Sequence, residues 1–346
     1  MTKKNEFKGK NILVTGGTGS IGLEIVRQLL KYKPNVIRIF ARHEDRHHHV
    51  MQELGNERLR FIIGDVRDKD RLRMAMEGVD IVFHAAALKH VPLCEYNPFE
   101  AVKTNIVGTQ NVIESAREQG VKKVISISTD KVVDPTGVLG VSKLMGEKLS
   151  LAPYFSQGES AKTKFSCVRF GNVLGSRGSI LPLLKKQIFG KGEVTITDPN
   201  MTRFVMTIPQ AVKLVLSAAS MMQGREVFIL KMPSVYLVDL IKAAIEYYAP
   251  LAGKKVSDIK TKFIGKREGE KIHERLLADH EIDRALETKD MYVLTSTPLK
   301  NILEGKFDKT YSVVAWKNKD KDFFSEYAPQ LSHKELMAMI KEADIS

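Results

Sequence analysis

Cysteine and tryptophan are scarce in this chain of 346 residues, which has two cysteines and one tryptophan. Cys94 and Cys167 cannot form the disulfide framework that stabilises small secreted proteins, so a reducing compartment is expected. No apolar run approaches the roughly 20 residues that a membrane-spanning helix requires. The polar N-terminus, which leads directly into a strand, does not resemble a secretory signal peptide. These absences predict a cytoplasmic protein with no membrane partner.

The net charge is +13, from 54 Lys and Arg against 41 Asp and Glu. The cations are scattered and form neither a basic helix nor an aromatic-interleaved patch, so a solvated basic surface is favoured over a nucleic-acid partner. Anionic small molecules would account for a few of these charges. The triplet His47–His49 lacks the paired spacing of metal ligands and is expected at the surface. No metal site is therefore predicted.

Short runs rich in Val, Ile and Phe alternate with helical patterns in the first half of the chain. The runs are Lys10–Thr15, Val36–Ala41, Leu59–Ile63, Asp80–His84, Lys123–Ser128 and Phe165–Phe170, and the helical patterns are Asp70–Glu77, Pro98–Gln119 and Gly140–Leu149. This alternation predicts an α/β fold with a Rossmann-like, doubly wound parallel sheet. Ligands are then expected at the carboxyl ends of the strands.

After about Asn172 the pattern loosens. Helices are expected at Leu181–Phe189, Pro209–Met222, Leu237–Tyr248 and near His333–Ala343, and strands near Val194–Thr197, Glu226–Leu230 and Lys260–Ile264. We expect residues 1–171 to form the cofactor-binding domain, which also receives later strands. Residues 172–346 are expected to form mainly a smaller C-terminal substrate-binding lobe and a tail.

A glycine-rich turn follows the first expected strand and opens the first helix. Gly16, Gly19 and Gly22 have the spacing for a tight turn, close approach to a pyrophosphate and close helix–sheet packing. The unpaired N–H groups at the helix N-terminus would bind the same anion. The candidate cofactor contacts in this turn are Gly16, Thr18, Gly19, Ser20, Ile21 and Gly22.

The end of the second expected strand bears on the choice between NAD and NADP. Arg42 stands where NAD enzymes place an acidic residue for the ribose 2′-hydroxyl, and an arginine suits a 2′-phosphate instead. Glu44 and Asp45 follow closely, so NADP is favoured and NAD stays open. Further candidate cofactor contacts close the third and fourth strands, namely Asp65, Val66, Ala85 and Ala86. On spacing alone, a solvated loop aspartate suits Asp65 nearly as well.

The segment Ser126–Lys131 ends the fifth expected strand, and Lys143 lies on the next helix. Together with several other segments, it makes the chain resemble the UDP-N-acetylglucosamine 4,6-dehydratases of capsule and flagellin-glycan biosynthesis, in the extended short-chain dehydrogenase/reductase superfamily. The matching segments are 84–92, 104–105, 128–131, 169–173, 176–179, 197–204 and 267–271. The resemblance runs from about residue 9 to residue 294 and is to the short members without a membrane-spanning N-terminal region.

The resemblance implies an NADP-dependent lyase that removes water from UDP-N-acetylglucosamine and gives a UDP-4-keto-6-deoxy-hexosamine, with hydride moving from C4 to C6. Lys131 would be the base at C5 and Asp130 the acid for the departing 6-hydroxyl, with the Thr129 hydroxyl facing the sugar. Lys143 would contact the nicotinamide ribose. A cationic nicotinamide and Lys143 would then favour the neutral amine of Lys131. The family also implies a homo-oligomer.

Four residues are candidate substrate contacts. By resemblance, Asn172 would contact the diphosphate or uracil, and Lys89 would line the sugar pocket. Arg203 and Arg267 are candidate diphosphate clamps, since guanidinium donors match phosphate oxygens well. On composition alone, each of these cations would more often be a surface residue.

Leu139 stands four residues before Lys143, where many members have tyrosine. The resemblance includes a short-chain branch with methionine there, which inverts C5, and this favours an inverting enzyme. Lys131, Asp130 or a water held by Lys143 would then take the 4-hydroxyl proton. Two alternatives stay open. A related epimerase would normally need the missing tyrosine, and a non-catalytic NADP-binding sensor would have no need for the acid and the base.

Overall fold

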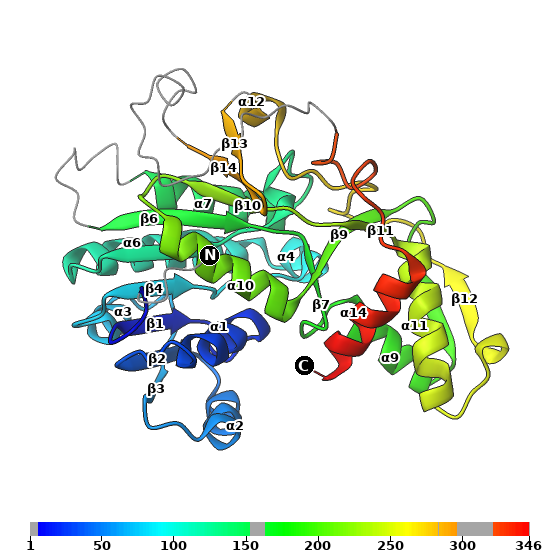
Figure 1. The fold of residues 1–346 in the computed structure, drawn as a ribbon, viewed down its shortest axis with the longest axis horizontal. Coiled ribbons are helices and arrows are strands. Elements are labelled where there is room, and N and C mark those ends of the chain that lie inside the picture. The colour runs from blue at the N-terminus through cyan, green and yellow to red at the C-terminus, as the bar shows by residue number, and fades with distance from the viewer. Residues whose placement is uncertain (1–5, 153–162, 283, 296–320, 346) are drawn as a thin grey trace.

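A large mixed sheet forms the centre of the protein. The computed structural model describes residues 6–152, 163–282, 284–295 and 321–345 (Figure 1). Within them, the sheet has nine strands in the order β13-β14-β10-β6-β5-β4-β1-β2-β3. The strands are β1 (Asn11–Thr15), β2 (Val36–Ala41), β3 (Leu59–Ile63), β4 (Ile81–His84), β5 (Lys123–Ile127), β6 (Lys164–Arg169), β10 (Val227–Leu230), β13 (Ala285–Glu287) and β14 (Met291–Leu294). Strands β3 to β10 in this order are parallel, whereas β14 pairs antiparallel with β10 and β13.

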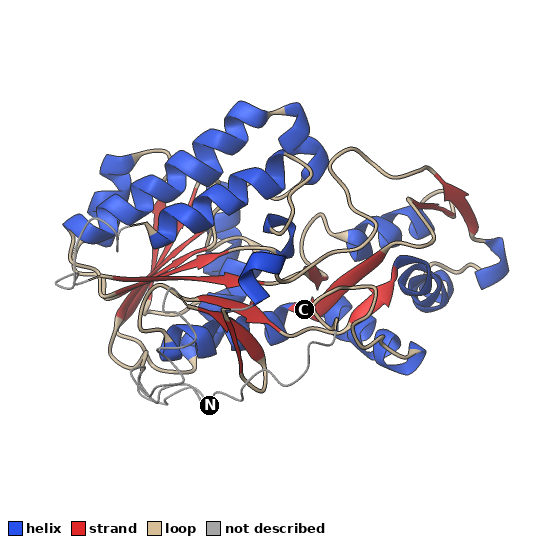
Figure 2. Ribbon diagram, turned by 90° about the horizontal axis from the view of Figure 1, so that it is seen from above, coloured by secondary structure: helices blue, strands red, loops and turns tan. Residues whose placement is uncertain are grey.

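Helices cover both faces of this sheet, as Figure 2 shows. Helices α1 (Ser20–Leu30) and α10 (Ile208–Met221) pack together, and α3 (Lys69–Met76), α6 (Gly108–Glu118) and α7 (Val138–Leu151) form another layer. Helix α2 (Glu44–Leu54) follows β2, while α4 (Val91–Tyr96), α5 (Pro98–Ala101) and a π-helical segment (Val102–Val107) lead into α6. Apolar side chains of the strands and both helical layers form the buried core. The predicted Rossmann-like α/β fold is confirmed.

A smaller lobe lies beside the sheet, at the right in Figure 1. It contains the three-stranded sheet β11-β9-β7 and the two-stranded sheet β12-β8. Its elements are β7 (Asn172–Leu174), α9 (Ile180–Phe189), β8 (Glu193–Ile196), β9 (Thr202–Thr207), β11 (Ser234–Tyr236), α11 (Leu237–Leu251), β12 (Lys260–Phe263) and α14 (His333–Ile345). A separate apolar cluster joins α9, α11 and α14, so the lobe has its own core.

One expectation about local structure was wrong. His47 is buried on α2, where its Nε2 lies 3.0 Å from the Ala41 carbonyl oxygen, because α2 turns this residue and Val50 toward the sheet. The helical pattern predicted over residues 98–119 is confirmed, and α5, the π-helical segment and α6 follow one another there. In the described ranges, no helix has both the length and the apolarity to cross a bilayer, and no three His, Cys, Asp or Glu side chains cluster as metal ligands would.

Candidate active site

The carboxyl ends of the parallel strands bring most of the expected site residues to one edge of the sheet. The glycine turn follows β1, Arg42 follows β2, Asp65 follows β3, Ala85 follows β4 and Asp130 follows β5. Parallel strands end at the same edge, so segments far apart in the sequence meet there. This edge is where the structure supports ligand binding.

The glycine turn has the shape of a pyrophosphate cradle. Gly16 has φ +67°, and a Cβ at this position would lie 2.8 Å from the Ala86 nitrogen and 2.9 Å from the Ala85 carbonyl carbon. A Cβ on Gly22 would lie 2.3 Å from the Gly16 carbonyl oxygen. Gly19 is the N-cap of α1 and supplies no side-chain cap, so N–H groups of the first turn are available to an anion. The residues fit a dinucleotide pyrophosphate.

Arg177, to which spacing along the chain assigned no role, joins the smaller lobe to this turn. Its guanidinium donates to the Thr18 carbonyl, and its backbone N–H donates to the Ser20 hydroxyl at 3.0 Å. Burial, with the charge of Arg46 adding, lowers the pKa of Arg177. Its presence within the matching segment 176–179 was the available signal. The structure shows that a cation from the lobe lies against the predicted pyrophosphate site.

The arginine predicted to distinguish NADP from NAD remains available to an anion. Arg42 is exposed, and its Nη1 lies 3.9 Å from Asp65 Oδ2, beyond hydrogen-bond distance. The Asp65 carboxylate instead accepts hydrogen bonds from the Arg67 side chain at 2.7 and 3.0 Å. Burial alone would raise the pKa of Asp65, but the hydrogen bonds from Arg67 lower it. Asp65 is therefore ionised and held by Arg67.

The acid expected at the end of β5 is completely buried. Asp130 begins a short 3₁₀ turn, Asp130–Val132, and its Oδ1 accepts from the Thr129 hydroxyl at 2.9 Å and from Lys131 Nζ at 3.0 Å. Its Oδ2 has no hydrogen-bond partner among the described residues. Burial raises the pKa of Asp130 despite the neighbouring ammonium. A carboxyl group that favours its protonated form in a closed site can act as a general acid.

Lys143 lies on α7 beside this turn. Its Nζ donates to the Ile127 carbonyl oxygen at 2.6 Å, and burial lowers the pKa of the amine. The hydrogen bond fixes the side chain at the end of β5, on the helix that packs against the Asp130–Val132 turn. Lys143 thus has the position that the sequence analysis expected, and its role stays a prediction.

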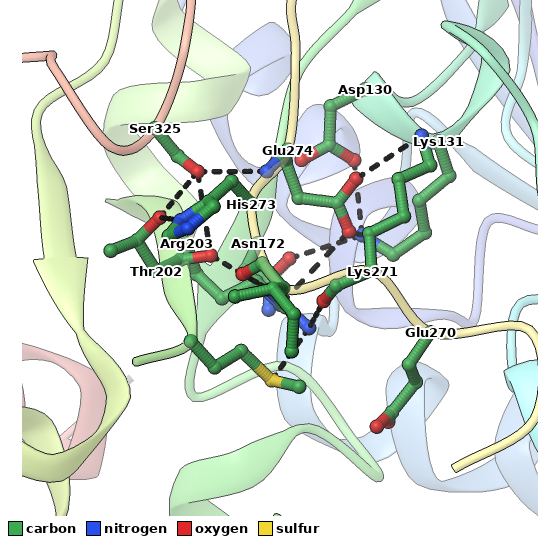
Figure 3. A network of polar contacts seen from close by, with 12 residues as sticks. Asp130, Lys131, Asn172, Thr202, Arg203, Glu270, Lys271, His273, Glu274 and Ser325 are labelled. Carbon is green, nitrogen blue, oxygen red and sulfur yellow. Dashed lines mark hydrogen bonds and ion pairs between the residues drawn. The ribbon is translucent and has the colours of Figure 1, made fainter. Parts of the chain in front are cut away.

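Lys131 has more acidic neighbours than the sequence revealed. Its Nζ lies 3.0 Å from Asp130 Oδ1, 3.3 Å from Asn172 Oδ1 and 3.5 Å from Glu274 Oε1 (Figure 3). Burial would lower the pKa of Lys131, but the charges of Asp130 and Glu274 outweigh burial and raise it. The expectation of a lowered pKa considered Lys143 and the cofactor alone. The raised pKa favours the ammonium form of Lys131, and Glu274 is the second counter-ion that stabilises it.

Arg203 is buried and engaged by the chain itself. Its terminal nitrogens donate to the carbonyl oxygens of Thr202, Lys271 and Ile272 at 2.7, 2.9 and 3.0 Å. Its Nε lies 4.0 Å from Glu274 Oε1. Arg203 thus holds the 271–274 segment against β9 (Figure 3). Phosphate binding by Arg203 stays a prediction, and a phosphate would have to share the guanidinium with these carbonyl oxygens.

The other candidate substrate contacts differ in position. Asn172 begins β7 and faces Lys131. Arg267 lies in an exposed loop, with its guanidinium 3.8 Å from Glu270. Lys89 is exposed in the loop after β4. Asn172 therefore lies beside the Asp130–Lys131 pair, whereas Arg267 and Lys89 are at the surface, accessible to a ligand.

Leu139 closes one side of a small pocket. The pocket is lined by Val91, Lys131, Thr136, Gly137, Leu139, Gly140, Gly269, Lys271 and Glu274. Leu139 is 5% exposed and packs in an apolar cluster with Cys94 and Ala101. It therefore fills space between α4, α5 and α7 and presents an apolar wall to Lys131 and Glu274.

Comparisons with known proteins place the chain among polysaccharide biosynthesis proteins. The profile described as polysaccharide biosynthesis protein matches residues 12–296. An uncharacterized membrane protein of Methanocaldococcus jannaschii is 58% identical over 84% of this chain and 87% of its own length. The UDP-N-acetylglucosamine 4,6-dehydratase (inverting) of Campylobacter jejuni is 42% identical over 98% of this chain and 99% of its own. A UDP-glucose 4-epimerase of Rickettsia bellii is also 42% identical, over 83% of each chain.

A solved structure agrees with the whole fold. The X-ray structure of Pen from Bacillus thuringiensis superposes with a TM-score of 0.88 and is 42% identical, covering 99% of both chains. Similarity therefore extends over both the large sheet and the smaller lobe.

Proposed function

The chain belongs to the polysaccharide biosynthesis family within the extended short-chain dehydrogenase/reductase superfamily, and we propose that it is a UDP-N-acetylglucosamine 4,6-dehydratase that inverts C5. One observation carries the choice of reaction. A fully buried carboxyl group, Asp130, lies 3.0 Å from the amine of Lys131 at the end of β5. Elimination of water next to a ketone requires such an acid and such a base together. The relative with this activity matches the full chain, which supports the same assignment.

The residues suit the two proton transfers of the elimination. The positive charge of a bound nicotinamide, together with Lys143, would shift Lys131 from the ammonium ion to the free amine. The free amine of Lys131 then removes the C5 proton, and Asp130 donates its proton to the departing 6-hydroxyl, which leaves as water. Thr129 donates a hydrogen bond to Asp130 and keeps its carboxyl group oriented. The glycine turn after β1 would hold NADP⁺, which when bound would supply the acceptor for the C4 hydride and the donor of that hydride to C6, while C5 would regain a proton that comes from solvent. This role requires the protonated form of Asp130, which burial favours because it raises the pKa of the carboxyl group.

The 4-hydroxyl proton requires a further acceptor, because Leu139 has none to offer. Lys131, Asp130 and Lys143 are the titratable groups at the end of β5, and Lys143 is fixed by its hydrogen bond to Ile127. We assign the proton to a water held by Lys143, because the amine of Lys131 is needed for the C5 proton. Asp130 is less suitable because it already holds the proton that the leaving group needs.

The cofactor is proposed to be NADP. The Gly16 and Gly22 contacts leave room for a pyrophosphate at the start of α1, and Arg42 lies at the end of β2 with its guanidinium exposed. Arg177 and the neighbouring Arg46 increase the positive potential of the same edge. NAD stays the alternative. Titration of the protein with each cofactor, and of Arg42→Ala with each, tests this choice: the variant is expected to lose affinity for NADP and to keep its affinity for NAD.

The reaction is tested by NMR on UDP-N-acetylglucosamine and NADP in D₂O. Loss of one water, with solvent deuterium at an inverted C5, supports the proposal. A retained C5 configuration would leave dehydration intact and overturn inversion. Lys131→Ala is expected to lose turnover while keeping NADP affinity, and full turnover in this variant would remove Lys131 from the mechanism.

The epimerase relative gives the second candidate function a specific basis. An epimerase would exchange the configuration at C4 without loss of water, and the Asp130–Lys131 pair would have no proton to deliver to a leaving group. The same NMR experiment separates the two, because the epimer keeps its 6-hydroxyl. An unchanged substrate together with tight NADP binding would instead indicate a sensor.

A homo-oligomer is proposed from the exposed apolar side chains on neighbouring helices. Tyr96 is 90% exposed on α4, Phe99 is 78% exposed on α5, and Val141 and Met145 are exposed on α7. These helices contact one another, so the side chains form one surface region. Clustered apolar surface of this kind is typical of protein interfaces. Light scattering should show self-association, and the double variant Tyr96→Glu with Phe99→Glu should weaken it.

A further inference from the structure

Glu274 is a buried carboxylate at the candidate catalytic pair that the proposed reaction does not yet use. It is 2% exposed, lies in the loop after β12, and is fixed by two bonds to residue 325: its N–H donates to the Ser325 hydroxyl at 2.8 Å, and its carbonyl accepts from the Ser325 N–H at 2.9 Å. Its Oε1 lies 3.5 Å from Lys131 Nζ. Lys131 is therefore located between two carboxyl groups that come from distant parts of the chain (Figure 3).

The two carboxyl groups have unequal surroundings. Three cations face Glu274: Lys131 at 3.5 Å, Lys271 at 3.6 Å and the Arg203 Nε at 4.0 Å. Of the residues that the structure describes, Asp130 faces Lys131 alone as a cation, at 3.0 Å, and its carboxyl group also accepts a hydrogen bond from the Thr129 hydroxyl. Both groups are almost inaccessible to water. Charge in such a site is stable only where it is compensated, so the extra cations favour ionisation of Glu274.

The protonation preferences follow this asymmetry. Burial raises the pKa of Asp130, and the charge of Glu274 raises it further. Burial would also raise the pKa of Glu274, but Lys131, Arg203 and Lys271 lower it. When the pKa values of two neighbouring carboxyl groups are shifted in opposite directions, one group can hold a proton while the other stays ionised.

Building on the proposed dehydratase reaction, we infer that Glu274 is a positioning residue, the permanent counter-ion of Lys131 that leaves Asp130 free to hold the proton for the leaving group. One ammonium ion and one carboxylate then neutralise each other, and Asp130 remains a neutral acid. Without Glu274, Asp130 would have to ionise to balance Lys131. The acid needed for elimination would then be absent at neutral pH.

Glu274→Gln tests this arrangement because it removes the charge and keeps the size of the side chain. In the variant, Asp130 becomes the sole counter-ion of Lys131, so its proton is lost at a lower pH. The alkaline limb of the pH–turnover profile should move down by about one pH unit or more, the usual effect of one neighbouring charge. Glu274→Asp, which keeps the charge, should return the limb toward that of the wild type.

Infrared difference spectroscopy reads the same proton without substrate. The carbonyl band of a protonated carboxylic acid, identified by its loss in Asp130→Asn, should disappear at a lower pH in Glu274→Gln than in the wild type. Glu281→Gln is the matched control, because Glu281 is also buried but pairs with Arg169 at 2.8 Å. It should lower stability and leave the Asp130 band and the alkaline limb in place.

The outcomes separate the two proposals. A wild-type protein that does not dehydrate the sugar overturns the proposed function. The infrared titration still tests whether Glu274 keeps Asp130 protonated, because it needs no substrate. An Asp130 band that titrates identically in the wild type and in Glu274→Gln overturns the inference, even if dehydration is observed. Equal shifts in Glu274→Gln and Glu281→Gln would show a general structural effect and would also overturn it.

Discussion

Replacement of Leu139 by tyrosine tests whether the apolar residue is a defect or a structural requirement. Leu139 is 5% exposed in the first turn of α7, packed in a cluster with Cys94 and Ala101. A larger side chain in a well-packed cluster costs roughly 1–3 kcal/mol of unfolding free energy. A phenol hydroxyl buried there without a partner would add about 1–3 kcal/mol. We therefore expect Leu139→Tyr to be destabilised by about 2–6 kcal/mol.

The assay combines urea unfolding with turnover of UDP-N-acetylglucosamine. Leu139→Met is the control, since an apolar exchange of similar volume should cost less than about 1.5 kcal/mol and leave turnover near the wild type. We expect no gain in turnover for Leu139→Tyr, because the pocket wall at Leu139 belongs to the packing between α4, α5 and α7. A tyrosine variant that unfolds like the wild type and turns over at least tenfold faster would refute this reasoning.

Three further predictions concern the cofactor edge and the core. Gly16→Ala places a Cβ within 2.9 Å of the Ala85–Ala86 backbone at φ +67°, so cofactor affinity measured by calorimetry should fall at least about tenfold, which corresponds to about 1.4 kcal/mol; unchanged affinity would show that the turn adapts. His84 is buried between Thr15 and Thr109, and burial lowers its pKa to about 3. Between pH 6.5 and pH 3 this imidazole is therefore protonated in the unfolded chain and neutral in the folded protein. Unfolding free energy should therefore decrease from pH 6.5 toward pH 3, by about 2 kcal/mol at pH 5, and His84→Gln should lack this component when urea unfolding is compared at pH 7 and pH 5. Arg169→Met removes the cation that lies 2.6 Å from the buried Glu147 carboxylate and 2.8 Å from that of Glu281, and should lower the unfolding free energy in urea by about 3–5 kcal/mol. If changing both glutamates to Gln as well restores none of this stability, the unpaired charges are not the cause of its loss.

The local pattern of apolar residues was sufficient to predict the parallel strands of the large sheet. The expected ranges of β2 and β3 agree with the structure, because each strand is a short apolar run bounded by turn residues. The antiparallel pair β13 and β14 was not predicted from its sequence. These strands are only three and four residues long, and their place at the sheet edge depends on pairing with β10. Such pairing leaves no periodic signal in so short a segment.

The glycine turn and the neighbouring Asp130 and Lys131 could be identified from the amino-acid order, because each is contained in a short continuous segment. The departure of Leu139 from the usual tyrosine was visible there too. The packing of Leu139 among the helices and the engagement of Arg203 by backbone carbonyls became apparent in the folded chain, since both depend on contacts between distant segments. The fold also brings Glu274, which lies in the loop after β12 and far from Lys131 along the chain, to within 3.5 Å of the Lys131 amine. Charge balance in a buried site depends on every group within a few ångströms, and that set is fixed by the fold rather than by spacing along the chain.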